Sequence, residues 1–176
     1  MTTRVAFLRA VNLGTRTARS SQLVAAVEGL GYSGAWTHIN SGNVVFDAPG
    51  SRSHLERELE AAFEKTLGFE ATTFVRTASE LRTAVAEPPF AVSTGDTYFI
   101  TFLKESLAAP KRTALEALSN DFDTLVVNGR DVHWRMHGKS TDTRLKTKQW
   151  DGVIGHHRST SRNMNMLRKL VAKLDQ

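Results

Sequence analysis

Apolar and polar residues alternate along the first part of the chain in runs with strand-like and helix-like spacing. Residues 5–11 are mostly apolar and predict a central strand that contains Arg9. After Ser20, apolar residues recur at helical spacing, which predicts an amphipathic helix. Residues 36–39 and 44–46 flank a short polar segment and predict a hairpin.

Two capping signals mark the next helices. Ser53 and Glu56 have the spacing of a capping box and predict the start of a second helix. Residues 69–75 alternate threonine with apolar residues and predict a strand. Thr77 and Glu80 form a second capping-box pair and predict a third helix. Up to the third helix, the order β-α-β-β-α-β is the ferredoxin-like split arrangement.

The rest of the chain repeats this logic. A Pro88-Pro89 pair ends the third helix and predicts a boundary between subdomains. A strand, a helix and a hairpin around Asn128-Gly129 follow, and then a further helix. The last helix is expected over residues 161–174, whose apolar residues recur every three or four positions.

These elements predict an α+β fold of two ferredoxin-like (βαββαβ) subdomains packed together. The expected N-terminal subdomain covers residues 1–88. The expected C-terminal subdomain covers residues 89–176 and carries an extra terminal helix.

The composition excludes several classes of chemistry. The 176 residues include no cysteine, so disulfides, thiolate metal sites and a cysteine nucleophile are excluded. No nucleophile elbow, Walker loop or dinucleotide fingerprint occurs, and the histidines lack carboxylates at metal-ligand spacing. We therefore expect no metal and no cofactor, and the sequence leaves open whether the protein is an enzyme.

Location and partners are constrained less directly. No signal-peptide pattern opens the chain, and no apolar run approaches the roughly 20 residues of a membrane helix, so we expect a cytoplasmic protein that does not bind membranes. Residues 129–176 hold 11 Lys or Arg against 4 Asp or Glu, whereas residues 1–128 have a net charge of −2. A basic final quarter attracts anions, including nucleic acid, although no aromatic RNA-binding motif accompanies it. The sequence does not set an oligomeric state.

Two polar strings, residues 9–14 and residues 40–43, follow the first and second predicted strands. In the split topology these two strands run parallel, so the strings meet at one end of the sheet. Arginine offers a fork for a carboxylate or phosphate, while asparagine and serine offer oriented donors. The alternative is plain turn chemistry, which favours the same residues. The candidate ligand-binding residues here are Arg9, Asn12, Ser41 and Asn43.

The start of the last predicted helix supplies two further candidates, Arg162 and Asn163. With Ser161 as N-cap, the helix N-terminus could bind an anion through its N–H groups. We expect all six candidates to line a cleft between the subdomains that binds an anionic or phosphorylated small molecule. The alternatives are an ordinary cap with a surface arginine, and nucleic-acid binding through the basic quarter.

Several strings resemble a family, the bacterial domain of unknown function 1697. The resemblance is specific in residues 5–14, where the family usually has Gly at Ala10, and in residues 37–46, where it usually has Gln at Asn40. Residues 160–164 stand where Thr-Thr-Arg-Asn-Trp is typical. The resemblance implies two ferredoxin-like subdomains and implies no activity.

Overall fold

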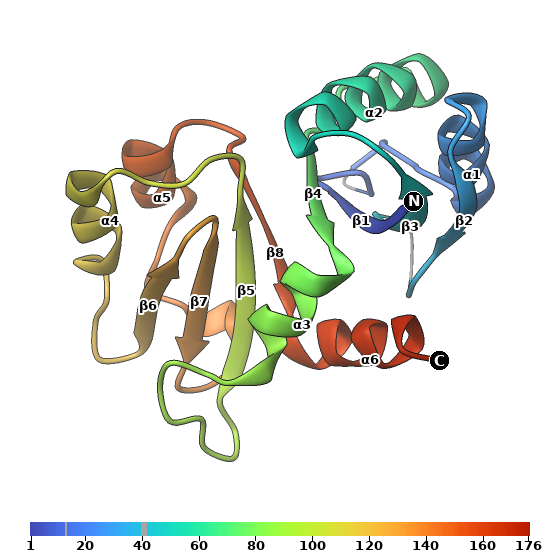
Figure 1. The fold of residues 1–176 in the computed structure, drawn as a ribbon. Helices are drawn as coiled ribbons and strands as arrows, with labels where there is room; N and C mark the ends of the chain where they lie inside the picture. The colour runs from blue at the N-terminus through green and yellow to red at the C-terminus, as the bar shows by residue number, and fades with distance from the viewer. Residues whose placement is uncertain (13, 40–41) are drawn as a thin grey trace. The chain divides into compact units, whose positions relative to one another are not determined.

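Two four-stranded antiparallel sheets organise the described part of the chain in a computed structural model (Figure 1). The chain divides into two compact units, and each is described by itself. Unit 1 comprises Met1–Leu81 and Leu174–Gln176, and unit 2 comprises Arg82–Lys173. The residues that the structure describes are 1–12, 14–39 and 42–176.

Unit 1 contains a sheet with the strand order β2-β3-β1-β4, in which all neighbours are antiparallel. Its elements are β1 (Thr2–Leu8), α1 (Ser20–Gly29), β2 (Ser33–Thr37), β3 (Asn43–Ala48), α2 (Arg52–Leu67) and β4 (Thr73–Thr77). Because β1 and β2 are each antiparallel to β3, they point in the same direction. Their C-terminal ends therefore lie at the same end of the sheet, as the sequence predicts.

Helices α1 and α2 pack against each other and cover one face of this sheet. Leu23 of α1 and Leu59 and Phe63 of α2 are fully buried in the core between the helices and the strands. On the sheet side they meet residues such as Leu8 and Phe46. Burial of each such side chain stabilises the fold by about 1.5–3 kcal/mol.

Glu56 has a different role from the predicted one. Helix α2 is capped by Ser51, whose Oγ accepts a hydrogen bond from the backbone N of His54. Glu56 is only 3% exposed, and its carboxylate accepts a hydrogen bond from the backbone N of Val75 at 2.8 Å. It also pairs with Arg52 at 2.7 Å. The carboxylate therefore joins α2 to strand β4 instead of capping the helix.

The second predicted capping box is confirmed. The backbone N of Thr77 donates to Oε2 of Glu80 at 2.8 Å, and the backbone N of Glu80 donates to Oγ1 of Thr77 at 3.0 Å. This pair opens α3 (Ala78–Ala86), within which the division between the two units falls.

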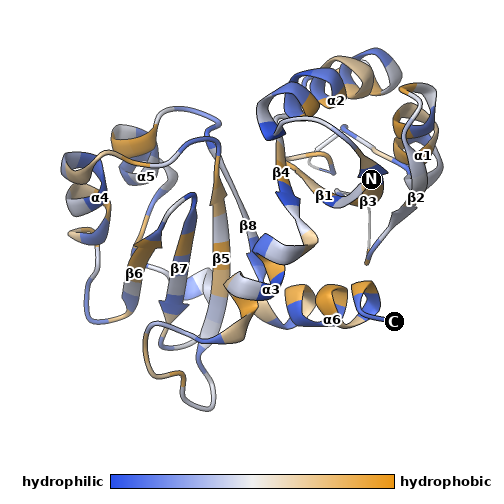
Figure 2. Cartoon of the chain, in the orientation of Figure 1, coloured by the Kyte–Doolittle hydropathy of each residue, from blue (hydrophilic) through white to orange (hydrophobic). Residues whose placement is uncertain are grey.

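Unit 2 repeats the topology of unit 1, with the strand order β6-β7-β5-β8. Its elements are β5 (Thr97–Leu103), α4 (Ala109–Glu116), β6 (Asp123–Asn128), β7 (Asp131–Met136), a 3₁₀ turn (Ser140–Asp142), α5 (Thr147–Ile154), β8 (Ser159–Asn163) and α6 (Met164–Leu174). Leu115, Leu125, Val127 and Trp150 form part of a core beneath α4 and α5, and Figure 2 shows the hydrophobic character of β5 and β6. The predicted fold class, α+β with two ferredoxin-like halves, is confirmed.

Strand β8 corrects the prediction that the last helix begins at Ser161. Residues 159–163 pair with β5, and Oγ of Ser161 lies 2.8 Å from Oγ1 of Thr101 on the facing strand. Helix α6 begins only at Met164. The polar string that resembles a helix cap is therefore an edge strand, and its hydroxyl contacts form only when β5 lies beside it.

A buried carboxylate, Asp123, ties the segment before α5 to the sheet. Its side chain is fully buried, and its Oδ1 accepts hydrogen bonds from Nε1 of Trp134 at 2.9 Å and Oγ1 of Thr143 at 2.5 Å. Its Oδ2 accepts from the backbone N of Arg144 at 3.0 Å and Nδ2 of Asn120 at 3.1 Å. Desolvation alone would raise the pKa of Asp123, but these hydrogen bonds outweigh it and lower the pKa below 3.8.

We expect Asp123→Asn to lower the free energy of unfolding by about 2–3 kcal/mol. The amide nitrogen of asparagine would face N–H and O–H groups that now donate hydrogen bonds to the carboxylate. Since the folded pKa is depressed, the stabilisation is present above pH 3.8 and is lost as the pH falls through the folded value. Urea unfolding at pH 7 and at acidic pH measures both effects. The exposed Asp121→Asn serves as control; equal effects of the two substitutions at pH 7 would contradict this role.

Candidate functional site

The end of strand β1 is held from both sides. The backbone N of Leu8 donates to the carbonyl of Gly42 at 2.9 Å, and the backbone N of Arg9 donates to the carbonyl of Thr72 at 2.9 Å. Gly42 directly precedes β3 and Thr72 directly precedes β4. Arg9 is therefore the first residue beyond the central strand, fixed between two loops. The sequence predicts a strand that continues through Arg9 to Val11, which is wrong, because β1 ends at Leu8.

Asn43 stabilises the turn between β2 and β3. It is only 5% exposed, and its Nδ2 donates to the carbonyls of His38 at 3.0 Å and Ile39 at 3.3 Å. The backbone N of His38 donates to the carbonyl of Asn43 at 3.0 Å. Asn43 is the first residue of β3, and its side-chain amide holds the end of the preceding turn in place. Asn40 and the candidate Ser41 lie outside the described residues.

Asn12 fastens the loop between β1 and α1. Its Oδ1 accepts a hydrogen bond from the backbone N of Ala18 at 3.0 Å, although the residue itself is exposed. In the same loop the guanidinium of Arg16 lies over the ring of Phe69, 5.2 Å from its centroid. The Asn12 bond thus closes the loop on itself, and Arg16 joins the loop to Phe69.

Both loops contain backbone conformations that L-residues rarely adopt. Ala10, directly after Arg9, has φ +55°, and Ile39 has φ +40°. A left-handed conformation costs a residue with a Cβ about 1–2 kcal/mol, and the β-branched Ile39 is the more unusual case. Such conformations persist where the surrounding structure imposes them, and they concentrate at functional sites.

Unit 2 repeats the backbone arrangement around Arg9. The backbone N of Leu103 donates to the carbonyl of Arg130 at 2.8 Å, and the backbone N of Lys104 donates to the carbonyl of Arg158 at 3.4 Å. Arg130 lies in the turn between β6 and β7, and Arg158 directly precedes β8. Lys104 is therefore the counterpart of Arg9, the first residue past the central strand.

Sequence reasoning missed Lys104, although the chain contains a signal for it. The tripeptide Phe7-Leu8-Arg9 at the end of β1 matches Phe102-Leu103-Lys104 at the end of β5. Comparison of the two halves of the sequence could have identified this short repeat. A single lysine after a strand has no significance until the halves are aligned.

The remaining candidates belong to unit 2. Arg162 lies on β8 opposite Ile100, and its Nη1 donates to Oγ1 of Thr160 at 2.8 Å and to the carbonyl of Ser161 at 2.9 Å. Burial lowers the pKa of Arg162 to about 10, so the side chain stays charged at neutral pH. Asn163 ends β8. The shared cleft of all six candidates stays a prediction.

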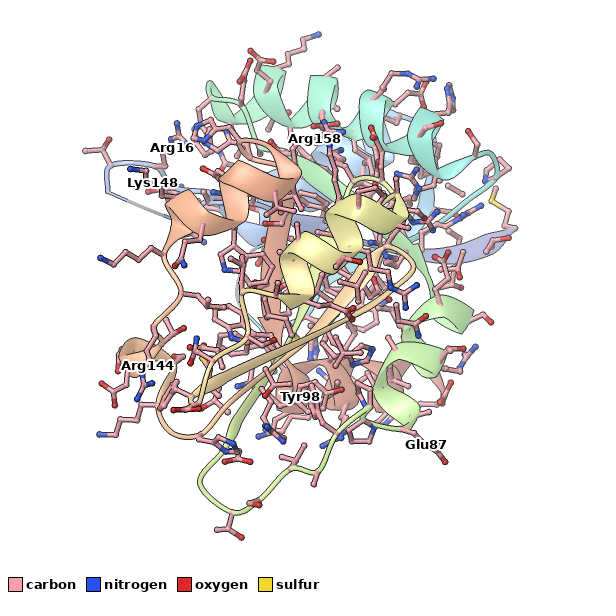
Figure 3. All side chains as sticks on the ribbon, turned by 90° about the vertical axis from the view of Figure 1, so that its left-hand side faces the viewer. Arg16, Glu87, Tyr98, Arg144, Lys148 and Arg158 are labelled. Carbon is pink, nitrogen blue, oxygen red and sulfur yellow. The ribbon has the colours of Figure 1, made fainter. Side chains whose placement is uncertain are left out.

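Unit 2 also holds a buried pair of titratable side chains that the sequence did not reveal. The hydroxyl of Tyr98, labelled in Figure 3, lies 2.5 Å from Nδ1 of His133, and both residues are buried. Burial raises the pKa of Tyr98 to about 12 and lowers the pKa of His133 below 6.5. Both side chains are therefore neutral at pH 7. Their contact depends on the β5–β7 register, which the sequence does not show.

Two absences among the described residues bear on function. Among them, no three His, Cys, Asp or Glu side chains are grouped so as to hold a metal ion. No helix within this part of the chain is long and apolar enough to cross a membrane.

A family model described as "Protein of unknown function (DUF1697)" matches residues 1–133. The chain belongs to the DUF1697 family. A similar solved structure is that of the conserved bacterial protein SP0830 from Streptococcus pneumoniae. It is 19% identical, with a TM-score of 0.74, and the match covers 100% of this chain and 99% of that one. This likeness concerns the fold. No curated protein matches the sequence.

The DUF1697 match includes the ends of both central strands. It contains Arg9 and its loop in unit 1, and Lys104 in unit 2. It ends at His133, before β8, so Arg158 and Arg162 lie outside it.

We expect Asn43→Ala to lower the free energy of unfolding by about 1–2 kcal/mol, because two carbonyls of the turn lose their shared donor. Chemical denaturation measures this change. The exposed Asn165→Ala, on the first turn of α6, is the matched control. Equal stability of the two variants would show that the amide of Asn43 contributes nothing to the turn.

Proposed function

We propose that this DUF1697 protein binds an anionic or phosphorylated small molecule and that Arg9 is the principal cation. One observation carries the proposal. Arg9 is fixed at the middle of the sheet end by backbone hydrogen bonds to strands on both sides, through Leu8 to Gly42 and through its own N to Thr72. A guanidinium presented from so rigid a base can bind a carboxylate or phosphate bidentately at low entropic cost.

The two loops beside Arg9 complete the proposed site. Asn12 and Asn43 contribute by holding the loops in place, which their hydrogen bonds to Ala18 and His38 support. Ser41 is proposed as a hydroxyl donor on the grounds of sequence alone. The left-handed backbone next to Arg9 supports a loop whose shape serves binding more than stability.

Arg162 and Asn163 remain part of the proposal as a second cation and amide. Arg162 stays charged at neutral pH and can therefore supply a cation to an anionic ligand. Their meeting with Arg9 in one cleft is proposed on the grounds of sequence alone.

Nucleic-acid binding is the second candidate, and one observation favours it. Arg144, Lys146 and Lys148 are all exposed around the start of α5, and Figure 3 shows the first and last of them. Two features count against a continuous basic surface. Arg158 pairs with Glu105 at 2.7 Å, and Arg162 is only partly exposed, with its Nη1 bound to Thr160 and Ser161. Binding through phosphates would weaken steeply with salt, whereas no binding at low salt would exclude it.

Thermal shift with a panel of nucleotides, sugar phosphates and carboxylates tests the proposal. A true ligand at about 100 times its Kd stabilises the folded state by about 2.7 kcal/mol, which raises Tm by about 5–10 °C in a chain of this size. We expect Arg9→Gln to weaken the affinity for that ligand at least about tenfold, because a hydrogen bond to a charged group contributes about 1.5–3 kcal/mol.

Arg57→Gln is the matched control, since Arg57 is an exposed arginine of the same unit on helix α2. The control should keep the full thermal shift. If Arg9→Gln and Arg57→Gln respond alike to the ligand, the assignment to Arg9 is wrong. If the whole panel leaves Tm unchanged, the proposed function is wrong for these ligand classes.

A further inference from the structure

A cavity of about 220 Å³ lies in unit 2 at the end of β5, beside the counterpart of Arg9. The loop after β5, the first turn of α4 and the segment before β8 enclose it. All of its lining residues belong to unit 2, so the cavity is complete within that unit. Its apolar walls are formed by Leu103, Leu107 and Ile154.

The charged lining of this cavity is predominantly basic. The lining contains three cations, Lys104, Lys111 and Arg158, and one carboxylate, that of Glu105. Nη2 of Arg158 binds Oε1 of Glu105 at 2.7 Å, and the three cations and one carboxylate together give the lining a formal charge of +2. Lys104 is only 7% exposed, so water screens the interaction of its ammonium with an ion in the cavity less than it would at an exposed lysine.

The backbone fixes two of these cations at the cavity. The N of Lys104 donates to the carbonyl of Arg158, so the two residues are held side by side. Gly155 has φ +91° and ψ 162°, a region open almost only to glycine. A Cβ at this position would lie 3.1 Å from Cγ of Arg158. The glycine thus makes room for the stem of the arginine, whose position is labelled in Figure 3.

We propose that this cavity binds the phosphoryl group of a small phosphate monoester between Lys104, Lys111 and Arg158. A phosphate monoester carries a charge of about −1.5 to −2 at neutral pH, which matches the excess charge of the lining. The cavity is smaller than the roughly 300–1,000 Å³ of sites for drug-sized ligands, so the organic part is a short carbon chain that rests on the apolar wall. The site lies in a different unit from Arg9 and does not depend on the function proposed there.

Isothermal titration with glycerol 3-phosphate and with inorganic phosphate, at pH 7.5 and low salt, tests this site. We expect saturable binding of glycerol 3-phosphate and none of glycerol. Lys111→Gln should weaken binding at least about tenfold, because it removes a charged hydrogen-bond donor. Lys104→Met should do the same, because it removes the ammonium. Methionine keeps much of the apolar stem of the lysine, so the packing around residue 104 is preserved.

The matched control is Lys148→Gln, an exposed lysine of the same unit that does not line the cavity, and its affinity should stay within about twofold of the wild type. No saturable binding to the wild type, or equal affinities of Lys111→Gln and Lys148→Gln, would overturn the proposal. Lys111 is exposed, so this comparison decides the matter even if Lys104→Met fails to fold.

Discussion

In each unit the first strand is hydrogen-bonded along both edges, and this double pairing determines what lies at its end. Strand β1 pairs with β3 and β4, and β5 pairs with β7 and β8. The chain can leave such a strand only between the loops that precede its two neighbours. The next residue is then fixed by backbone bonds on one side or both, at the centre of the sheet end. That residue is Arg9 in unit 1 and Lys104 in unit 2.

A cation at this point is an uncommon choice on stability grounds, because the sheet end adjoins a buried core and charges are costly to desolvate. Its presence in both halves links the two binding proposals through one structural principle. The halves differ in what surrounds the cation: a loop tied down by Asn12 in unit 1, and a short loop leading into α4 in unit 2. Each surrounding defines its own ligand site, so the two sites can differ in specificity.

The sequence predicts most of the fold because the signals for its elements are local. Apolar periodicity and the Thr77–Glu80 box report on short segments, and both are realised in the structure. Errors occur where a residue acts over a long range. Glu56 has the local spacing of a cap but binds the backbone of β4, and residues 159–163 have the composition of a helix start but pair with β5.

The candidate site could be predicted only in part for the same reason. That the two polar strings begin at the same end of the sheet follows from strand direction, which the order of elements already implies. Leu8, which directly precedes the first string, is bonded to Gly42 of the second. The hydrogen bonds that Asn12 and Asn43 make within their own loops could not be predicted from the sequence, because turns and ligand sites favour the same side chains. The position of Lys104 as the counterpart of Arg9 follows from the matching backbone hydrogen bonds of the two units.

A titration of the ¹⁵N-labelled protein with inorganic phosphate, followed by ¹H–¹⁵N correlation spectra, tests most directly whether the ends of the central strands bind anions. Besides the amides of Arg162 and Asn163, we expect saturable shifts at two places. These are the amides of residues 9–12 and Gly42 in unit 1, and the amides of residues 104–107 and Arg158 in unit 2. Shifts absent from both places, or largest at residues 144–148, would contradict it.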